Sequence, residues 1–462
     1  MKLLLIIPNS KNIIRTIRLG LLYIASSLRK EGSHHIKIID AKHEGLSDKE
    51  VCQRIKDLSP EVVGISGLST EATEVHKLAS LAKQIDTKCK VVIGGPYASS
   101  SPEFIIKDPN VDFVVIGEGE RTVCELINAL ENDGDASRID GIAFKNGDKS
   151  VIKPPKALIE DLDSIAFPAW DLIDMERYFN DLHRHSQCPI PTSNKIVPIF
   201  TSRGCPFGCI YCHDIFGKKT RLRSVQNVIE EIELLVKKYD VGEIEIVDDH
   251  FSFDLTRAKQ ICDEIIRRGI RIHLCFPNGL RADRMDEELI DKLKKAGTHL
   301  INYGIESASD NVQKRIRKNS NLAKSKQIIN YTFRQGIITG GFFMIGFPGE
   351  TKEEMLQTIR FAIEKPFYLM SLTFVTPFPN TELFEELERK NIELEKIKLH
   401  NLDMLSINLS SVSDLELKKM WAKAYREFYF RPSQMWRLYK VIPNKRALLQ
   451  NALVMLRRSI TR

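Results

Sequence analysis

The feature that most constrains the fold of this 462-residue chain is a repeated alternation of short apolar runs with stretches of helical periodicity. Apolar runs of about four to eight residues, bounded by turn residues, are typical of buried parallel strands. Parallel strands need a crossover, usually a helix, to return the chain to the same edge of the sheet. The alternation therefore predicts an α/β protein, and it occurs twice, before about residue 130 and again from residue 196.

The first block predicts a Rossmann-like, doubly wound sheet of five parallel strands. We expect these strands at Lys2–Ile7, His35–Asp40, Glu61–Ser66, Lys90–Gly94 and Asp112–Gly117. Ligands of such sheets bind beyond the carboxyl ends of the strands. Small and polar residues gather at three of these ends, namely Ser66, Ser69, Thr70, Gly94, Gly95, Gly117, Glu118 and Gly119. The glycines let a ligand approach the backbone, although tight strand-to-helix turns would also explain them. A nucleoside triphosphate or dinucleotide is disfavoured, since neither a Walker-type loop nor Gly-x-Gly-x-x-Gly follows the first strand.

The second block predicts a partial parallel barrel of six β/α repeats. Its expected strands are 196–200, 243–247, 270–276, 299–305, 337–345 and 370–376. Barrel chemistry takes place at the carboxyl ends of the strands. Polar or flexible residues follow four of these strands, namely Asp248, Asp249, His250, Asn278, Arg281, Glu306, Ser307, Gly346 and Glu350. We therefore expect domains at 1–150 and 196–400, joined by a linker at 151–195 that begins next to a hairpin around Asn146-Gly147.

Three of the nine cysteines form a motif directly after the first barrel strand. Cys205, Cys209 and Cys212 have the spacing C-x3-C-x2-C, whereas the other six, at 52, 89, 124, 188, 262 and 275, are scattered singly in apolar segments. Single buried cysteines behave as small hydrophobic residues. Three close thiolates can hold an iron–sulfur cubane and leave one iron without a protein ligand. A zinc site with His213 as fourth ligand is the alternative, and the tight loop favours the cluster.

Charge and hydropathy exclude several functional classes. The net charge is +7, with acidic and basic residues interspersed, so no nucleic-acid partner is expected. No apolar run reaches the roughly 18 residues of a membrane span. The apolar residues at the start predict a buried strand rather than an export signal, and we therefore expect a reducing cytoplasm.

The last region, 401–462, predicts helices at Trp421–Tyr429, Met435–Val441 and Lys445–Ser459, the last one basic and amphipathic. A helix of this kind can lie on the anionic inner face of a membrane. The favoured interpretation is that it caps the barrel and exposes a solvated basic face.

The cysteine loop, with an aromatic residue before the third cysteine on the first strand of a six-repeat barrel, resembles the radical S-adenosylmethionine (SAM) superfamily. Several further stretches are similar to its cobalamin-binding branch: 248–251, 303–307, 346–351 and 376–381. Gly94-Gly95-Pro96 followed by Gly117-Glu118-Gly119-Glu120 is similar to the cobalamin domain that precedes the barrel in that branch. Together these resemblances cover most of the chain.

The resemblance implies a role for each matching residue. Cys205, Cys209 and Cys212 would hold a 4Fe-4S cluster, whose open iron the amino and carboxylate groups of SAM would chelate. Binding of SAM itself would involve the Tyr211 backbone at the adenine, Asp248 and Asp249 at the methionine amino group, Arg281 and Glu306 near the carboxylate and ribose, and the stretch that contains Gly346 and Glu350 at the adenine.

One departure concerns the lower axial ligand of cobalamin. The Asp-x-His-x-x-Gly motif is missing after the first strand, where the chain has Pro8-Asn9-Ser10-Lys11-Asn12. Asp40–Gly45 contains the right residue types with the wrong spacing on the wrong strand. The resemblance therefore implies cobalamin without a histidine from this motif.

The activity that the resemblance implies is radical C-methylation. One electron would cleave SAM to a 5'-deoxyadenosyl radical, which abstracts hydrogen from an unactivated carbon, and methylcobalamin would supply the methyl group. The alternative is radical cyclisation, rearrangement or oxygenation of a lipid, pigment or antibiotic precursor, and a non-catalytic cobalamin or iron–sulfur module is a third. The implied partners are a small-molecule or lipid substrate and an electron donor such as flavodoxin or ferredoxin.

Overall fold

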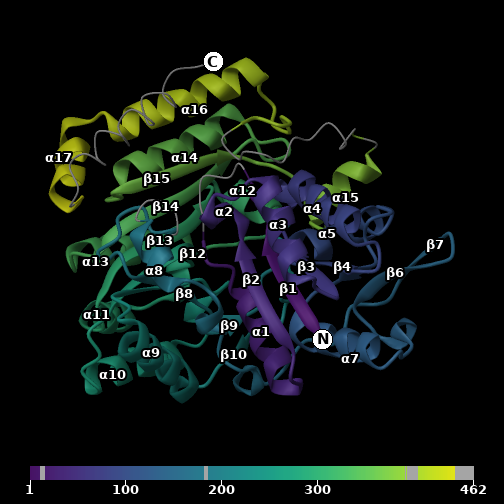
Figure 1. Ribbon diagram of the computed structural model, residues 1–462. Coiled ribbons are helices and arrows are strands. Elements are labelled where there is room, and N and C mark those ends of the chain that lie inside the picture. Colours follow the sequence, from purple (N-terminus) through teal and green to yellow (C-terminus); the bar gives the residue numbers. More distant parts are fainter. Residues whose placement is uncertain (11–15, 182–185, 391, 393–403, 443–462) are drawn as a thin grey trace. The chain divides into compact units, whose positions relative to one another are not determined.

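The computed structural model describes residues 1–10, 16–181, 186–390, 392 and 404–442 (Figure 1). The chain divides into two compact units. The first comprises Met1–Ser186 and Asp214–Arg223, and the second comprises Gln187–His213 and Ser224–Arg462. The predicted fold class, an α/β protein with a Rossmann-like sheet, a parallel barrel-type sheet and C-terminal helices, is confirmed.

The first unit contains a seven-stranded sheet in the order β2-β1-β3-β4-β5-β6-β7. Five strands are parallel: β1 (Lys2–Ile7), β2 (His35–Asp40), β3 (Val62–Ser66), β4 (Lys90–Gly94) and β5 (Phe113–Val115). The antiparallel hairpin of β6 (Ile142–Asn146) and β7 (Lys149–Ile152) extends the sheet, as the Asn-Gly turn predicts. The helices are α1 (Leu19–Glu31), α2 (Ala41–Glu44), α3 (Asp48–Leu58), α4 (Ala72–Ile85), α5 (Pro96–Ser100), α6 (Pro102–Ile105), α7 (Gly119–Glu131) and α8 (Met175–Asn180).

Both faces of this sheet are covered, which explains why its first strand is apolar throughout. Leu4 and Ile6 belong to one hydrophobic core with side chains of α3 and α4. Leu3, Leu5 and Ile7 belong to the other core, with side chains of α1 and α7. In the sheet, β2 lies on one side of β1, and β3 to β5 lie on the other side. The direction in which successive strands are added to the sheet therefore reverses between β1 and β3. Ligands of open α/β sheets bind at such a reversal.

The predicted linker packs against the first unit over much of its length. The backbone N–H of Ala169 donates to the carbonyl of Leu22, and the Tyr178 hydroxyl of α8 donates to Asp40 Oδ2 at 2.5 Å. A second segment, 214–223, also belongs to this unit and contains the short strand β10 (Arg221–Leu222).

The second unit contains six parallel strands that pair in chain order, as the predicted partial barrel requires. They are β8 (Ile196–Ile199), β11 (Glu243–Ile246), β12 (His273–Leu280), β13 (Thr298–Glu306), β14 (Ile338–Ile345) and β15 (Leu369–Phe374). The two-residue strand β9 (Ser202–Arg203) leads into the cysteine loop. The helices are α9 (Val225–Tyr239), α10 (Leu255–Arg267), α11 (Glu287–Lys295), α12 (Asp310–Arg315), α13 (Leu322–Arg334), α14 (Lys352–Glu364) and α15 (Glu382–Arg389).

Two C-terminal helices, α16 (Asp414–Tyr429) and α17 (Pro432–Val441), complete the described part of this unit. In Figure 1, α16 runs in yellow beside α14 and β15. Its tyrosine hydroxyls bond the backbone of the edge strand β15: Tyr429 Oη accepts from the N–H and donates to the carbonyl of Met370, and Tyr425 Oη does the same at Leu372. The predicted helix at Lys445–Ser459 lies outside the described residues. Within the described ranges, no helix is both long enough and apolar enough to cross a bilayer.

Candidate active site

The cysteine loop presents three reduced thiols at the carboxyl end of the barrel. Cys205 and Cys209 are partly exposed and Cys212 is exposed, whereas Cys262 and Cys275 of the same unit are buried. The loop backbone is anchored at both ends, because Gly204 N–H donates to Asp249 Oδ2 at 3.1 Å and Ile210 N–H donates to the carbonyl of Ile316 at 3.2 Å. An anchored loop with three accessible thiols fits an iron–sulfur cluster, which needs thiolate ligands and an open side.

Apolar side chains of the second unit pack against this loop. Ile210 lies in a core cluster with Val312, Ile316, Phe347, Val375, Leu383 and Leu387, and Tyr211 packs against it. The rings of Tyr211 and Phe347 lie 5.8 Å apart. The predicted adenine-side residues, Tyr211 and the stretch after β14, are therefore brought together.

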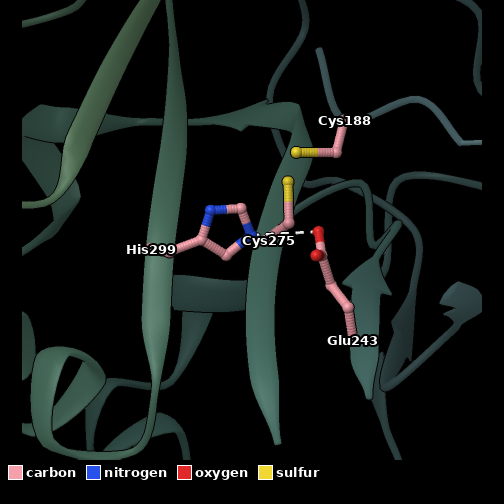
Figure 2. A group of neighbouring side chains, drawn as sticks. All are labelled: Cys188, Glu243, Cys275 and His299. Atoms are coloured by element: carbon pink, nitrogen blue, oxygen red, sulfur yellow. Dashed lines mark hydrogen bonds and ion pairs between the residues drawn. The ribbon is translucent and has the colours of Figure 1, made fainter. Parts of the chain in front are cut away.

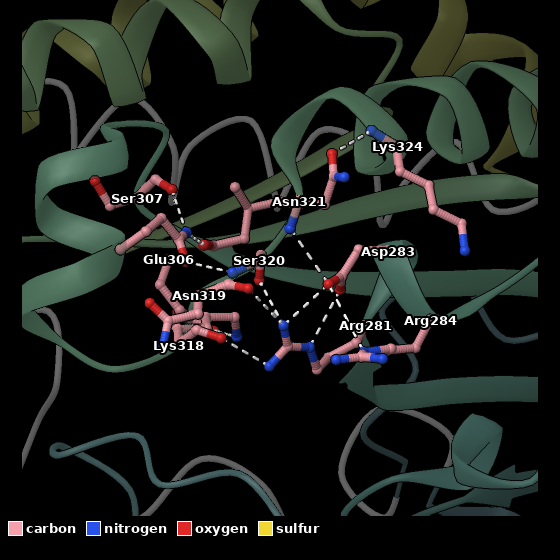
Figure 3. A network of polar contacts seen from close by, with 12 residues as sticks. Arg281, Asp283, Arg284, Glu306, Ser307, Lys318, Asn319, Ser320, Asn321 and Lys324 are labelled. Atoms are coloured by element: carbon pink, nitrogen blue, oxygen red, sulfur yellow. Dashed lines mark hydrogen bonds and ion pairs between the residues drawn. The ribbon is translucent and has the colours of Figure 1, made fainter.

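Arg281 stacks on the loop from the side. Its guanidinium carbon lies 3.8 Å from the centroid of the Phe207 ring, between the first two cysteines in sequence. It also forms a two-pronged ion pair with Asp283 and donates from Nη1 to the Lys318 carbonyl at 2.9 Å (Figure 3). Most donors of Arg281 are thus used within the protein, and the structure gives it a positioning role beside its predicted contact with SAM.

Lys318 is a charged residue of this network that sequence reasoning missed. Its ammonium donates to Glu306 Oε1 at 3.1 Å, and both side chains are largely buried (Figure 3). Glu306 has φ = +63° and Asn319 has φ = +48°, a backbone region that residues other than glycine rarely adopt. Strained backbone of this kind is concentrated at functional sites, but it is a structural signal that the sequence does not display.

The two aspartates after β11 have different roles. Asp248 is buried, with Oδ1 accepting from the N–H of Thr201 and Oδ2 from the hydroxyls of Thr201 and Ser202. Burial raises the pKa of the Asp248 carboxyl. The structure therefore gives Asp248 a structural role, in which it ties β11 to the strand before the cysteines. Asp249 contacts the loop itself through Gly204, and it is the better placed of the two for the predicted amino-group contact.

His250 packs beside the same loop. Its ring centroid lies 5.3 Å from that of Phe207. Burial, followed by the charge of Arg281, lowers the pKa of His250 to about 4. The imidazole is consequently neutral at pH 7, so one of its ring nitrogens can accept a hydrogen bond there.

Glu350 is a buried carboxylate with one unused oxygen. Its Oε2 accepts from the N–H groups of Gly346 and Phe347 at 2.7 and 3.1 Å, while Oε1 has no hydrogen-bond partner within the described structure. Burial raises the pKa of Glu350 to about 7. The φ of +95° at Gly346 requires a glycine at this turn. A buried, unpartnered acceptor fits a ligand donor arriving at the end of β14.

In the first unit, the predicted glycines differ in the space around them. A Cβ atom placed on Gly94 or Gly117 would meet no atom within 4 Å, whereas one on Gly95 would lie 2.8 Å from Ser66 Oγ and one on Gly119 would lie 3.1 Å from Ile24. The open backbone after β4 and β5 leaves room for a ligand to approach there.

The polar residues predicted with these glycines are partly used inside the unit. Ser69 Oγ lies 3.3 Å from Ser100 Oγ, and Thr70 follows it in the same turn. The Glu118 side chain is buried, and Arg221 Nη1 donates to both of its carboxylate oxygens, to Oε1 at 2.9 Å and to Oε2 at 2.8 Å. Its Oε2 also accepts from the N–H of Ile159. These bonds give Glu118 a structural role, and its contact with cobalamin stays a prediction.

His43, from the stretch with the wrong motif spacing, is packed in an aromatic stack. Its ring lies 3.8 Å from the ring of Tyr178, and the two planes are within 3° of parallel. The side chain is almost wholly buried in α2. This packing is consistent with the prediction that the motif histidine is missing.

Two family descriptions match the two units. Residues 15–127 match the B12 binding domain, and residues 199–362 match the radical SAM superfamily. Each match covers the strands whose carboxyl ends carry the predicted ligand residues.

Relatives match nearly the whole chain. An uncharacterised methyltransferase of Pyrococcus horikoshii is 34% identical over 94% of this chain and 93% of its own length. The cytidylyl-2-hydroxyethylphosphonate methyltransferase of Streptomyces wedmorensis is 31% identical over 91% and 89%. The anaerobic magnesium-protoporphyrin IX monomethyl ester cyclase of Rubrivivax gelatinosus is 27% identical over 88% and 72%.

A solved structure has the same fold. The radical S-adenosylmethionine methyltransferase TsrM of Kitasatospora setae, with cobalamin and a [4Fe-4S] cluster bound, aligns with a TM-score of 0.70 at 20% identity. The alignment covers 84% of this chain and 75% of that one. The family matches of both units agree with the relatives, and this chain belongs to the B12-binding, cobalamin-dependent methyltransferase-like branch of the radical SAM enzymes.

Proposed function

We propose that this radical SAM enzyme methylates an unactivated carbon of its substrate, with cobalamin as the methyl carrier. The observation that carries the proposal is the pair of relatives named as methyltransferases, each above 30% identity over about nine tenths of this chain, across both units. The substrate itself is a small molecule or a lipid in this proposal.

The cofactors supply the reactive chemistry. When bound, the cluster supplies the electron that cleaves SAM to a 5'-deoxyadenosyl radical, and cobalamin supplies the methyl group. The residues of this chain bind and orient these groups. Cys205, Cys209 and Cys212 hold the cluster, while Tyr211 and the turn of Gly346 and Glu350 receive the adenine.

The charged residues around the loop have the complementary task of orienting the amino acid part of SAM. Asp249 is assigned to its amino group, and the Glu306–Lys318 pair to the ribose and carboxylate side. The aromatic and aliphatic packing of Ile210, Tyr211 and Phe347 excludes water from one side of the loop.

Cobalamin is bound in this proposal without a lower-ligand histidine from an Asp-x-His-x-x-Gly motif. His43 is the histidine of the nearest motif-like stretch, and its ring is stacked on Tyr178. Electron paramagnetic resonance of the cob(II)alamin-loaded protein tests this point. We expect no nitrogen splitting from a protein imidazole, and a His43→Ala spectrum identical to that of the wild type. A nitrogen splitting lost in His43→Ala would refute this assignment.

Counting the products of SAM tests methyl transfer. Anaerobic, reduced protein loaded with iron, sulfide and hydroxocobalamin should form 5'-deoxyadenosine, together with S-adenosylhomocysteine that depends on added cobalamin. Cys209→Ala should abolish 5'-deoxyadenosine. A protein that forms 5'-deoxyadenosine but never S-adenosylhomocysteine, with cobalamin bound, would not be a methylase.

Radical cyclisation is the second candidate, because the cyclase of R. gelatinosus also matches most of the chain. It predicts 5'-deoxyadenosine without S-adenosylhomocysteine. A non-catalytic module predicts neither product.

The cellular setting completes the proposal. We place the enzyme in a reducing cytoplasm with flavodoxin or ferredoxin as electron donor. Contact with the inner face of a membrane would involve Lys445–Ser459, and a vesicle-binding comparison with and without these residues tests it.

A further inference from the structure

A second group of metal-ligating side chains lies at the amino-terminal end of the barrel strands. Cys188, Glu243, Cys275 and His299 offer one ligand atom each, and these four atoms all lie within 4.8 Å of one another (Figure 2). Glu243 is the first residue of β11, His299 the second of β13 and Cys275 the third of β12. Cys188 comes from the segment before β8. The group is therefore at the opposite end of the strands from the cysteine loop.

The composition of this group is unusual for a protein interior. Cys188 is 5% exposed, Cys275 and Glu243 are fully buried, and the His299 side chain is 13% exposed. Buried carboxylates are costly unless they are paired or bind a metal. The two cysteines, expected from the sequence to be isolated small hydrophobic residues, instead face each other beside an imidazole and a carboxylate (Figure 2). The expectation was wrong because pairing of β11, β12 and β13 brings distant residues together.

A surrounding shell of hydrogen bonds holds the ligands in place. Glu243 Oε2 accepts from the N–H and the hydroxyl of Thr192 at 2.6 and 2.7 Å and from Ser193 N–H at 3.2 Å. Its other oxygen, Oε1, lies 2.9 Å from His299 Nε2 and faces the group. Glu245 Oε1 accepts from the backbone N–H of Cys188 at 2.8 Å. Carboxylates oriented by such outer contacts are typical of metal ligands.

We propose that Cys188, Cys275, His299 and Glu243 bind a structural Zn²⁺ ion. Two thiolates, one imidazole and one carboxylate form a four-coordinate set of the kind that zinc prefers. A tetrahedron with the usual zinc–ligand bond lengths has edges of about 3.3–3.8 Å. Any separation near the 4.8 Å limit must therefore shorten, and the 2.9 Å between His299 Nε2 and Glu243 Oε1 must lengthen slightly. Binding releases one proton from each thiol, and the zinc ion replaces the proton shared by His299 Nε2 and Glu243 Oε1.

The site is closed, since all four positions come from the protein. It would fasten the segment 187–193 to three barrel strands just before β8, the strand that leads to the cysteine loop. A closed site at the amino-terminal face of a barrel contributes stability rather than chemistry.

Metal analysis of the full-length protein tests the proposal. Protein isolated without added zinc and passed through a chelating resin should contain about one zinc per chain. The same amount should remain in the triple variant Cys205→Ala, Cys209→Ala, Cys212→Ala, which separates this ion from metal in the cysteine loop. Cys275→Ala and Cys188→Ala should each lower the zinc content at least tenfold.

Cys262→Ala is the matched control, because Cys262 is equally buried but lies in α10 away from the group. It should retain its zinc. Growth in cobalt provides a second readout. The absorption bands of a tetrahedral, thiolate-ligated cobalt ion are expected in the wild type and also in the triple variant.

Three outcomes would overturn the proposal. They are a wild-type protein without zinc or cobalt at this site, a Cys188–Cys275 disulfide found by peptide mapping of the native protein, and zinc that disappears in the triple variant. A failure of the proposed methylation would not affect any of these readouts.

Discussion

The two ends of the barrel contain the same kinds of ligand residue in opposite arrangements. At the carboxyl end, Cys205, Cys209 and Cys212 lie on a loop whose backbone is anchored while the thiols stay accessible. At the amino end, Cys188 and Cys275 are buried beside His299 and Glu243. Metal sites that act on a ligand keep a position open, whereas structural sites are closed by protein ligands. The difference shows that exposure and ligand count, rather than cysteine content, separate a reactive site from a fastening one in this fold.

The largest expected effects come from replacing one cysteine at each end of the barrel by alanine. Cys209→Ala should lose 5'-deoxyadenosine formation entirely and most of its cluster iron, yet keep its zinc. Cys275→Ala should lose its zinc and melt at a lower temperature, while its remaining folded fraction still assembles the cluster. Iron and zinc counts with product analysis check both. A Cys209→Ala protein that loses both metals would break the comparison.

The next test concerns how the open loop is held. Arg281→Lys keeps the charge but loses the planar stack on Phe207 and the two-pronged pair with Asp283. We expect about a 100-fold slower SAM cleavage, since a bidentate pair and a close stack together contribute about 2–3 kcal/mol. A positioning role predicts an altered cluster signal in electron paramagnetic resonance, whereas a direct contact with SAM predicts a raised KM with an unchanged signal. Arg284→Lys, whose side chain is mostly exposed and lies farther from Phe207, is the control.

Two buried glutamates, Glu350 and Glu243, have pKa values that are shifted in opposite directions. Burial raises the pKa of Glu350, with its unused oxygen, to about 7. In the unfolded chain this carboxyl has its ordinary pKa of 4.5, so it releases its proton at a lower pH than in the folded protein. The stability of the folded state therefore falls as the pH rises from 4.5 to about 7. At Glu243, burial is more than offset by His299 and Thr192, and its pKa is lowered.

Glu350→Gln should consequently remove about 3 kcal/mol of this pH dependence. Melting curves of the variant and the wild type at about pH 5 and pH 8 measure it. The exposed Glu353→Gln in the first turn of α14, three residues after Glu350, is the control. Equal pH dependence in wild type and Glu350→Gln would mean that Oε1 has a partner in solution.

The smallest expected effect concerns the outer contacts of the closed site. Thr192→Val removes the hydroxyl bond to Glu243 Oε2 but leaves the backbone bonds. Loss of one outer contact should weaken zinc binding about tenfold, as measured by competition with a chromophoric chelator. An unchanged affinity would show that the backbone N–H groups alone orient the carboxylate.

The elements with strong periodicity could be predicted from the sequence. Strands β1, β2 and β4 have the predicted bounds Lys2–Ile7, His35–Asp40 and Lys90–Gly94. The C-x3-C-x2-C loop was predictable because its chemistry is local in sequence. Strand β12 runs to Leu280, beyond the predicted 276, because a register shift between Phe276 and Leu280 lets an irregular stretch continue the strand.

Contacts that depend on tertiary packing could not be predicted. The Glu118–Arg221 pair joins residues 103 positions apart, and the Glu306–Lys318 pair depends on a strained turn. The zinc-type group combines one residue from a loop with one from each of three strands. No spacing in the sequence reveals that set, because strand register alone brings the four ligands into reach.

The tyrosines of α16 have a consequence for how the barrel meets other molecules. An open sheet ends in a strand whose peptide groups invite another strand to pair with them. Tyr425 and Tyr429 occupy the groups of Leu372 and Met370 with phenol hydroxyls that both donate and accept. Helix α16 thereby occupies hydrogen-bonding groups that a neighbouring strand would otherwise use. At Met370 and Leu372, this edge of the sheet is therefore closed to pairing with a further strand.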